Sequence, residues 1–384
     1  MWLRKFAVVV SSFALVTALA ACDSGSTDSG ADSTSGLDSV ATPEAFTGDN
    51  GAPQDSVASD IAGPDLTNPD AAPDATSDTT PTPDATADVP PNPLAPPAPP
   101  AYSGAACPTL KAGANSFMSS AMARSVQVWL PPTPAGAGVM FLWHGFGDTG
   151  ANFGAAVGAA AIAKNYGVIV VSAQAVLDPL ESEKLVDFKD LAKQFIGEMP
   201  PTWSLFDGPG IDLVLFDDLL SCLDETFAID RTRVHTMGFS AGALWSTVLL
   251  LKRSDWLASA VLWSGGLGST GGLAEIVYTP YETPARDLPV LSVSGGASDV
   301  WPNTQLALVN FVKGSDELTA DLTADGHDVV RCDHGLGHTI PPNGLSWGLN
   351  FLFDHHWRVE GGTLYKSLDG LPFPAYCSMK LGAK

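Results

Sequence analysis

The sequence predicts an α/β domain built on a mostly parallel β-sheet with helices on both faces. Short apolar runs, such as residues 139–143 and 168–171, alternate along the chain with longer stretches of helical character, such as 211–227. Buried parallel strands read as continuous apolar runs because both of their faces are covered. The segment from 101 to 384 is long enough for one large domain of this class.

The predicted elements follow one another in a regular order. We expect strands at 125–130, 139–143, 168–171, 234–237, 260–263, 289–293 and 329–332, and helices at 151–164, 211–227, 241–251, 305–312 and 345–357. The leading hairpin-like segment at 125–130 alternates in polarity and would extend one edge of the sheet. In such sheets reactive side chains gather at the carboxyl ends of the strands.

Residues 1–21 have the layout of a bacterial secretory signal, with Arg4 and Lys5 before an apolar run. The closing residues, Leu-Ala-Ala-Cys at 19–22, resemble a lipobox. This resemblance implies that Cys22 becomes the lipid-modified first residue of a surface lipoprotein held at a membrane. Ordinary cleavage after Ala21, with an unmodified Cys22, is the alternative.

Residues 22–100 form a segment that we expect to be disordered. Between Asp23 and Pro100 the chain has 14 acidic residues and 14 prolines but neither Lys nor Arg. Such a composition buries too little apolar surface to fold. We therefore expect an extended acidic tether, with one folded domain at 101–384 beyond it.

The charge of the domain bears on its partners. The formal net charge of −23 falls to −11 for residues 101–384 once the 14 acids of the tether and the two bases of the signal are set aside. An acidic domain is a poor partner for nucleic acid, so we expect none. We also expect a monomer.

Four cysteines remain in the predicted domain, an even number that suggests disulfides in an exported protein. They are Cys107, Cys222, Cys332 and Cys377. Cys107 and Cys377 stand near the two ends of the domain, so we expect them to form one bridge and Cys222 with Cys332 the other. Because Cys222 lies on the apolar face of the predicted helix 211–227, a buried free thiol is the alternative.

The pentapeptide Gly-Phe-Ser-Ala-Gly at 238–242 stands where a predicted strand runs into a predicted helix. In such a turn the serine, here Ser240, takes a strained conformation that exposes its hydroxyl, and the flanking glycines avoid a clash. Two other strand ends supply partners for it. Asp299 follows the strand at 289–293, and His338 lies in the glycine-rich loop after the strand at 329–332. The order Ser, Asp, His is that of α/β-hydrolases.

These motifs resemble the α/β-hydrolase esterases that include polyhydroxybutyrate depolymerases and feruloyl or acetylxylan esterases. The resemblance covers about residues 125–357. It is carried by HGFGDTG at 144–150, the serine pentapeptide, GGASD at 295–299 and GLGHTIP at 335–341. It implies an α/β-hydrolase fold, an ester substrate, no cofactor and no metal.

The resemblance and the chemistry of the side chains assign roles to five residues. Ser240 is the expected nucleophile, His338 the base and Asp299 the group that orients the imidazole. The backbone amides of Phe146 and Ala241 are the expected oxyanion hole. His334, four residues before His338, is the rival for the base.

Two tryptophans are candidate substrate contacts. Trp203 lies in the long connection from about 173 to 210, which we interpret as a pocket wall or partial lid. Trp301 stands two residues beyond Asp299. For both residues simple packing is the alternative.

We therefore expect an exported serine hydrolase that acts on polymer-derived esters, either polyhydroxyalkanoate or feruloyl and acetyl groups on plant polysaccharide. HGFGDTG is also similar to small carboxylesterases and acyl-protein thioesterases, which supplies the alternative among hydrolases. A peptidase and a non-catalytic surface-binding lipoprotein with this fold are further alternatives.

Overall fold

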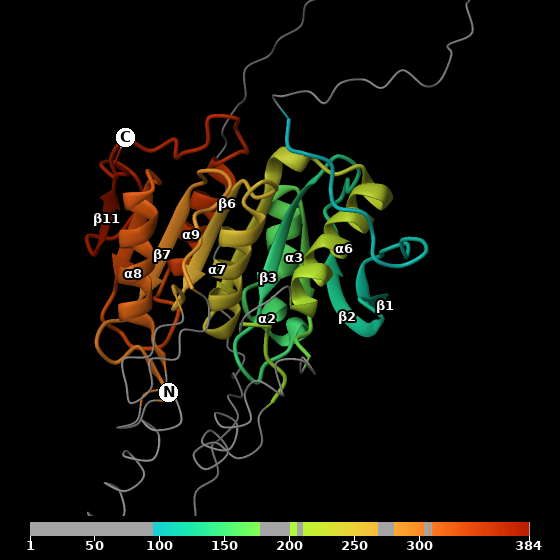
Figure 1. The fold of residues 1–384 in the computed structure, drawn as a ribbon, viewed down its shortest axis with the longest axis horizontal. Coiled ribbons are helices and arrows are strands. Elements are labelled where there is room, and N and C mark those ends of the chain that lie inside the picture. Colours follow the sequence, from blue (N-terminus) through green and yellow to red (C-terminus); the bar gives the residue numbers. More distant parts are fainter. Residues whose placement is uncertain are drawn as a thin grey trace, which may run out of the picture. The chain divides into compact units, whose positions relative to one another are not determined.

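The computed structural model describes residues 95–176, 200–205, 210–267, 280–302, 307 and 309–383. Nine strands of this part form one sheet (Figure 1). In their order across the sheet they are β1 (Gly113–Ser119), β2 (Met122–Trp129), β4 (Val168–Ala173), β3 (Gly138–Trp143), β5 (Val234–Phe239), β6 (Ser259–Trp263), β7 (Val290–Ser294), β10 (Val329–Asp333) and β11 (Cys377–Lys380).

The centre of the sheet is parallel and both of its edges are antiparallel. Strands β4, β3, β5, β6, β7 and β10 run in one direction. The hairpin of β1 and β2 adds the antiparallel edge that the sequence predicts, and β11 closes the opposite edge against β10. The structure therefore confirms the prediction of a mostly parallel sheet.

Helices cover both faces of the sheet, as Figure 1 shows. One face carries α6 (Ile211–Phe227), α7 (Ala241–Arg253) and α8 (Phe311–Ala324). The other carries α2 (Gly150–Ala156), α3 (Ala159–Tyr166) and α9 (Gly344–Asp354). Short elements complete the described part: a 3-10 turn η1 (Arg231–Arg233) and the strand pair β8 (Val300–Trp301) and β9 (Val309–Asn310).

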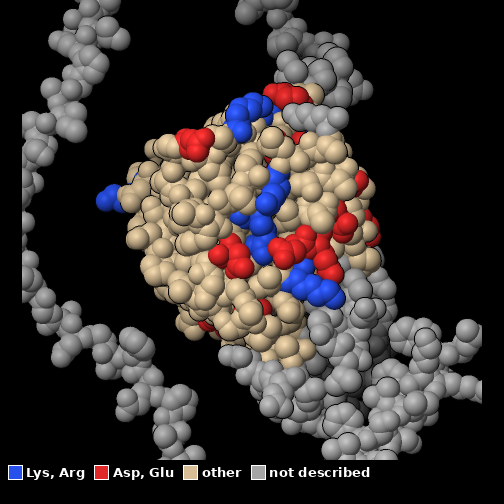
Figure 2. Space-filling model, turned by 90° about the vertical axis from the view of Figure 1, so that its left-hand side faces the viewer, with Lys and Arg blue, Asp and Glu red and all other residues tan. Residues whose placement is uncertain are grey.

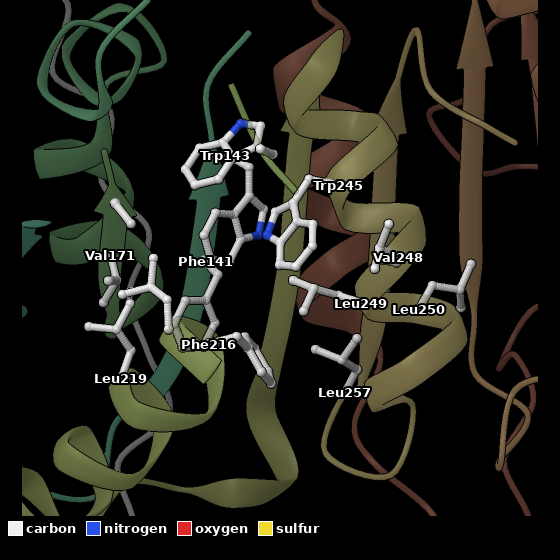
Figure 3. Close-up of a cluster of buried hydrophobic side chains, with 14 of the residues drawn as sticks. Phe141, Trp143, Val171, Phe216, Leu219, Trp245, Val248, Leu249, Leu250 and Leu257 are labelled. Atoms are coloured by element: carbon white, nitrogen blue, oxygen red, sulfur yellow. The ribbon is translucent and has the colours of Figure 1, made fainter. Parts of the chain in front are cut away.

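Large aromatic side chains fill the core beneath α6 and α7 (Figure 3). Phe141 of β3 lies 4.9 Å from the ring of Phe216 in α6, and Trp143 meets Trp245 of α7 edge-on at 6.1 Å. All four side chains are buried. Burying one such side chain contributes about 2–3 kcal/mol to stability. This core therefore fixes α7, whose N-cap is Ser240, against β3, the strand that precedes the HGFGDTG loop.

Three predicted helices differ from the structure. The last one, predicted at 345–357, is α9 and ends at Asp354. The stretch predicted as one helix at 151–164 forms α2 and α3, which are separated at Gly158, whose φ is +74°. The helix predicted at 305–312 is wrong where it can be compared, since Val309–Asn310 is strand β9 and helix α8 begins at Phe311. The Asn310 side chain caps α8 by accepting the Lys313 amide at 3.0 Å.

The described part begins at residue 95, within the segment predicted as tether. Pro96 is buried, and the Trp256 indole N–H donates to the Ala98 carbonyl at 3.1 Å. The rest of the predicted tether, the signal and Cys22 lie outside the described residues. None of the helices in the described part is long and apolar enough to cross a bilayer.

The predicted disulfide pairing is wrong. The structure has one bridge between Cys107 and Cys222 and another between Cys332 and Cys377. The physical reason is the order of the sheet. The segment containing Cys107 reaches α6 near the β1 edge, whereas Cys377 belongs to β11 at the opposite edge and pairs directly with Cys332 of β10. The two ends of the domain in sequence are therefore far apart across the sheet.

Charged side chains of both signs are interspersed on the face of the domain at the β11 edge (Figure 2). Two ion pairs lie on or beside α8. Arg331 lies 2.9 Å from Asp316, and Lys313 lies 3.7 Å from Glu317 one helical turn away. Exposed pairs of the latter kind contribute about 0.3–0.5 kcal/mol each.

The buried imidazole of His355 predicts a loss of stability in acid. Its Nδ1 donates to the Phe351 carbonyl at 2.6 Å, and its Nε2 accepts from the Thr363 hydroxyl at 2.9 Å. Burial lowers the pKa of His355 to about 4. The unfolded chain therefore takes up this proton at higher pH than the folded one, so His355 costs stability as the pH falls from about 6.5 to about 4.

We expect this histidine to remove about 3 kcal/mol from the free energy of unfolding across that interval. His355→Gln, which does not titrate, should flatten the pH dependence of urea unfolding by this amount. His356→Gln is the matched control at the neighbouring position. An equally steep dependence in His355→Gln and the unaltered protein would contradict the prediction.

Candidate active site

Ser240 stands at the junction between β5 and α7 in a conformation that few non-glycine residues adopt. Its φ is +57° and its ψ is −124°. The Ser240 amide donates to the carbonyl of Trp263 in β6 at 2.9 Å, which holds the turn against the neighbouring strand. A backbone of this kind costs about 1–3 kcal/mol and persists where the surrounding structure enforces it.

The two glycines of the pentapeptide are required by close backbone contacts. A Cβ atom on Gly238 would lie 2.1 Å from the Gly242 carbonyl oxygen. A Cβ atom on Gly242 would lie 1.9 Å from the carbonyl oxygen of Trp143 at the end of β3. Glycine at both positions therefore lets the helix start directly on top of the strand ends.

His338 links Ser240 to Asp299. Its Nε2 lies 2.9 Å from the Ser240 Oγ, and its Nδ1 lies 2.7 Å from the Asp299 Oδ1. An ionised carboxylate only accepts hydrogen bonds, so Nδ1 carries the proton and donates it to Asp299. The lone pair of Nε2 is then directed at the serine hydroxyl, which can donate to it.

Asp299 is buried and both of its carboxylate oxygens have partners. Its Oδ1 accepts from His338, while its Oδ2 accepts from the Ser264 hydroxyl at 2.9 Å and from the Gly295 amide at 2.8 Å. Ser264 is not among the site residues predicted from the sequence. The signal was available, because Ser264 follows the predicted strand at 260–263 directly, at the same edge of the sheet as the other candidates.

Backbone contacts join the loop that carries Asp299 to the loop that carries His338. The Gly337 amide donates to the Gly295 carbonyl at 2.6 Å. A Cβ atom on Gly295 would lie 1.8 Å from the Gly337 carbonyl oxygen, so a larger residue would force the loops apart. The separation of Asp299 from His338 is thus set by main-chain packing as well as by their own hydrogen bond.

Two phenyl rings flank the His338 imidazole. The ring of Phe311 stacks on it at 4.5 Å with an interplanar angle of 20°, and the ring of Phe239 lies at 4.9 Å with an angle of 32°. Phe311 belongs to the core on the α7 face of the sheet, whereas Phe239 packs on the core of the opposite face. The faces of these rings attract a cationic imidazolium.

The loop after β3 lies against Ser240. A Cβ atom added to Gly145 would lie 3.5 Å from the Ser240 Cβ. Within the loop, His144 is buried and takes no part in the chain of hydrogen bonds at Ser240. Its Nδ1 donates to the Gly145 carbonyl at 2.8 Å and its Nε2 accepts the Ala175 amide at 3.1 Å, while burial lowers its pKa. A neutral His144 therefore holds the loop.

The predicted oxyanion donors belong to this region. Ala241 is the first residue of α7, where a helix amide has no intrahelical partner. Phe146 lies in the loop beside Ser240 and is partly buried. The positive end of the α7 dipole adds to the attraction of an anion at Ala241. Their role as oxyanion donors stays a prediction.

The rival base, His334, is engaged elsewhere. Its Nδ1 accepts the Leu336 amide at 3.1 Å, and its own amide donates to the Ser294 carbonyl at 2.9 Å. Burial lowers the pKa of His334. The imidazole that contacts Ser240 and Asp299 is that of His338, and its role as the base stays a prediction.

Trp203 does not have the predicted position at the substrate. Its side chain is fully buried, and its indole N–H donates to the His144 carbonyl at 2.8 Å. Its ring also meets the ring of Trp143 edge-on, with 5.1 Å between their centroids. Trp203 is therefore a core residue beneath the HGFGDTG loop. Most of the connection from 173 to 210, the predicted pocket wall or lid, lies outside the described residues.

Trp301 remains a candidate substrate contact. It is partly buried and lies 5.0 Å from the ring of Phe146. The Trp301 ring is therefore a neighbour of the HGFGDTG loop, to which Phe146 belongs.

No protein-family model matches the sequence, and no curated protein sequence matches it. Solved structures do resemble it. The structure of native sOPH has a TM-score of 0.54 and 20% sequence identity, and the match covers 73% of this chain and 98% of that one. The structure of native pOPH has a TM-score of 0.54 and 18% identity, with 73% and 97% coverage.

We expect the Phe311 ring to raise the reactivity of Ser240. Phe311→Leu should lower the rate of Ser240 labelling by a fluorophosphonate about fivefold, because an imidazolium that forms as the serine attacks loses about 1 kcal/mol of attraction. The measurement is the second-order labelling rate of the folded variant.

Phe351→Leu is the matched control for Phe311→Leu, because Phe351 is equally buried on the opposite face and contacts His355 instead. Both variants should lose similar stability. Equal labelling rates in the two variants would show that the ring of Phe311 has only a packing role.

This chain combines a mostly parallel sheet that has helices on both faces with a strained serine between β5 and α7. An aspartate and a histidine follow the ends of β7 and β10 and are linked by hydrogen bonds to this serine. The protein therefore has the α/β-hydrolase fold.

Proposed function

We propose that this protein is a serine hydrolase of carboxylic esters. The observation that carries the proposal is the chain of hydrogen bonds from Ser240 through His338 to Asp299, at 2.9 Å and 2.7 Å. A serine hydroxyl is a weak nucleophile unless a base lies within hydrogen-bond reach, and a third group must hold that base in the required tautomer. Both geometric conditions are met in this arrangement.

The first half of the proposed reaction forms an acyl-enzyme. The Ser240 Oγ attacks the ester carbonyl as its proton passes to His338 Nε2, and the oxyanion is bound by the Ala241 and Phe146 amides. Collapse of the tetrahedral intermediate breaks the bond to the alcohol. The alcohol leaves with the proton from Nε2.

The second half returns the enzyme to its starting state. Water attacks the acyl carbonyl and gives a proton to His338 Nε2, and the same oxyanion donors act again. Collapse releases the carboxylic acid, and the Ser240 oxygen recovers the proton from Nε2. Asp299 stays ionised throughout, because it stabilises the imidazolium without taking its proton.

We propose polymer-derived esters as the substrate class, with polyhydroxyalkanoate and the feruloyl or acetyl groups of plant polysaccharide as the two candidates. The resemblance of the sequence motifs supports this assignment, and a long acidic tether suits a domain that must reach a bulky substrate. The neighbouring rings of Phe146 and Trp301 offer an apolar surface for an acyl or alcohol group.

We also propose that the mature protein is held at a membrane through lipid on Cys22. The signal-like residues 1–21 and the Leu-Ala-Ala-Cys sequence at 19–22 support this proposal. The disulfides Cys107–Cys222 and Cys332–Cys377 are compatible with an exported protein, since disulfides persist in oxidising compartments.

Ser240→Ala should lower the hydrolysis of p-nitrophenyl butyrate by at least about 1,000-fold, because the nucleophile is removed. The measurement is the initial rate with folded protein. Ser246→Ala is the matched control, since it removes a buried hydroxyl of the same helix that bonds to the Gly242 carbonyl. A Ser240→Ala variant as active as the unaltered protein would refute the serine mechanism.

Substrate assays on the unaltered protein then separate the candidates. Release of soluble acid from polyhydroxybutyrate film favours the depolymerase, and cleavage of methyl ferulate favours the feruloyl esterase. Activity on small esters alone would favour the alternative, a small carboxylesterase. A folded protein without activity on any ester would favour the non-catalytic lipoprotein.

Cys22→Ala in the full chain, expressed in a bacterial host, should move the protein from the membrane fraction to the aqueous fraction. The acylated residue is lost, and each buried methylene of its chains contributes about 0.8 kcal/mol to membrane binding. Ser24→Ala is the control within the same segment. Membrane retention that is equal in both variants would argue against an anchor at Cys22.

A further inference from the structure

Ser264 occupies a special position at the carboxyl end of β6. Its φ is +50°, which is uncommon for a residue other than glycine. Its side chain is buried, and its amide donates to the Val293 carbonyl of β7 at 2.8 Å. Strained backbones of this kind persist where the surrounding structure determines them, and they cluster at functional sites.

The hydroxyl of Ser264 contacts the carboxylate oxygen of Asp299 that His338 does not use. Its Oγ lies 2.9 Å from Asp299 Oδ2, and the Gly295 amide lies 2.8 Å from the same oxygen. The other oxygen, Oδ1, accepts from His338 Nδ1 at 2.7 Å. Donors on both oxygens prevent the carboxylate from rotating away from the imidazole.

We propose that Ser264 is a positioning residue that fixes Asp299, and through it the orientation and tautomer of His338. This inference rests on the proposed serine hydrolase function. Ser264 acts through Asp299, because its hydroxyl bonds to the carboxylate. The Gly295 donor belongs to the loop of Asp299 itself, four residues away, whereas Ser264 ties the carboxylate to a different strand.

The strained backbone is what directs the hydroxyl at Asp299. Ser264 follows Trp263, the last residue of β6, and a regular extended conformation would carry the chain onward beyond the sheet. The positive φ turns the chain at this residue while its amide stays paired with β7. A glycine would adopt this conformation more readily but would have no hydroxyl to donate.

The test compares two substitutions that separate the hydroxyl from the backbone. Ser264→Ala removes the hydroxyl and keeps the Cβ atom, whereas Ser264→Gly removes the hydroxyl and relieves the backbone conformation. Ser259→Ala is the matched control. Ser259 is a buried serine at the first position of β6, the strand that Ser264 follows, and its hydroxyl bonds to the Leu352 carbonyl.

We expect both Ser264 variants to lose about 10- to 100-fold in kcat on p-nitrophenyl butyrate, the loss that corresponds to one hydrogen bond to a charged group. KM should stay within about twofold, because Ser264 does not contact the substrate. Ser259→Ala should change neither constant. A kcat within about twofold of the unaltered enzyme in a folded Ser264 variant would overturn the proposal. The proposal would also be overturned if kcat fell in Ser264→Ala but stayed at the unaltered value in Ser264→Gly.

A spectroscopic measurement separates failure of this inference from failure of the proposed function. The proton between His338 Nδ1 and Asp299 should give a far-downfield resonance in the NMR spectrum, which does not depend on any substrate. Both Ser264 variants should shift or broaden this resonance, and Ser259→Ala should leave it in place. An unchanged resonance in both Ser264 variants overturns the positioning role even if the protein hydrolyses no ester.

Discussion

Parallel hydrogen bonding between neighbouring strands is the constraint on which the candidate site depends. Strands β3, β5, β6, β7 and β10 lie side by side in one direction, so all of their carboxyl ends meet at one edge of the sheet. From these ends come the HGFGDTG loop, Ser240, Ser264, Asp299 and His338. Residues separated by up to 98 positions in sequence thereby reach hydrogen-bond distance.

The strand ends bring these residues to one edge, but close backbone packing and buried hydrogen bonds align them. Gly242 lies on the Trp143 carbonyl and Gly295 on the Gly337 carbonyl, which leaves no space for a side chain at either position. Asp299 is then held through both of its oxygens. The strain at Ser240 is tolerated because the aromatic core under α7 holds the helix in place. Such a site is arranged before substrate binds, which is the condition for electrostatic catalysis.

The predictions from sequence were accurate where one local signal determined the structure. The apolar run and the glycines around Ser240 gave β5 and α7 to within two residues, and α6 was predicted with its observed bounds. Helix α8 was misplaced because its buried stripe includes Gly314, Ser315 and Thr319 and so has a weak apolar period. The disulfide pairing, the burial of Trp203 and the contacts of Ser264 and Phe311 depend on which strands and loops are neighbours. That order is a property of the whole sheet, which no local pattern encodes.

In the proposed reaction the hydroxyl of Ser240 forms the covalent intermediate. The most direct measurement is to mix the protein with p-nitrophenyl butyrate, quench it in acid within the first turnover and locate the acyl group by peptide mass spectrometry. We expect one butyryl group on the peptide that contains Ser240, and none in His338→Ala. An acyl group on another residue, or turnover without any acylated peptide, would refute Ser240 as the nucleophile.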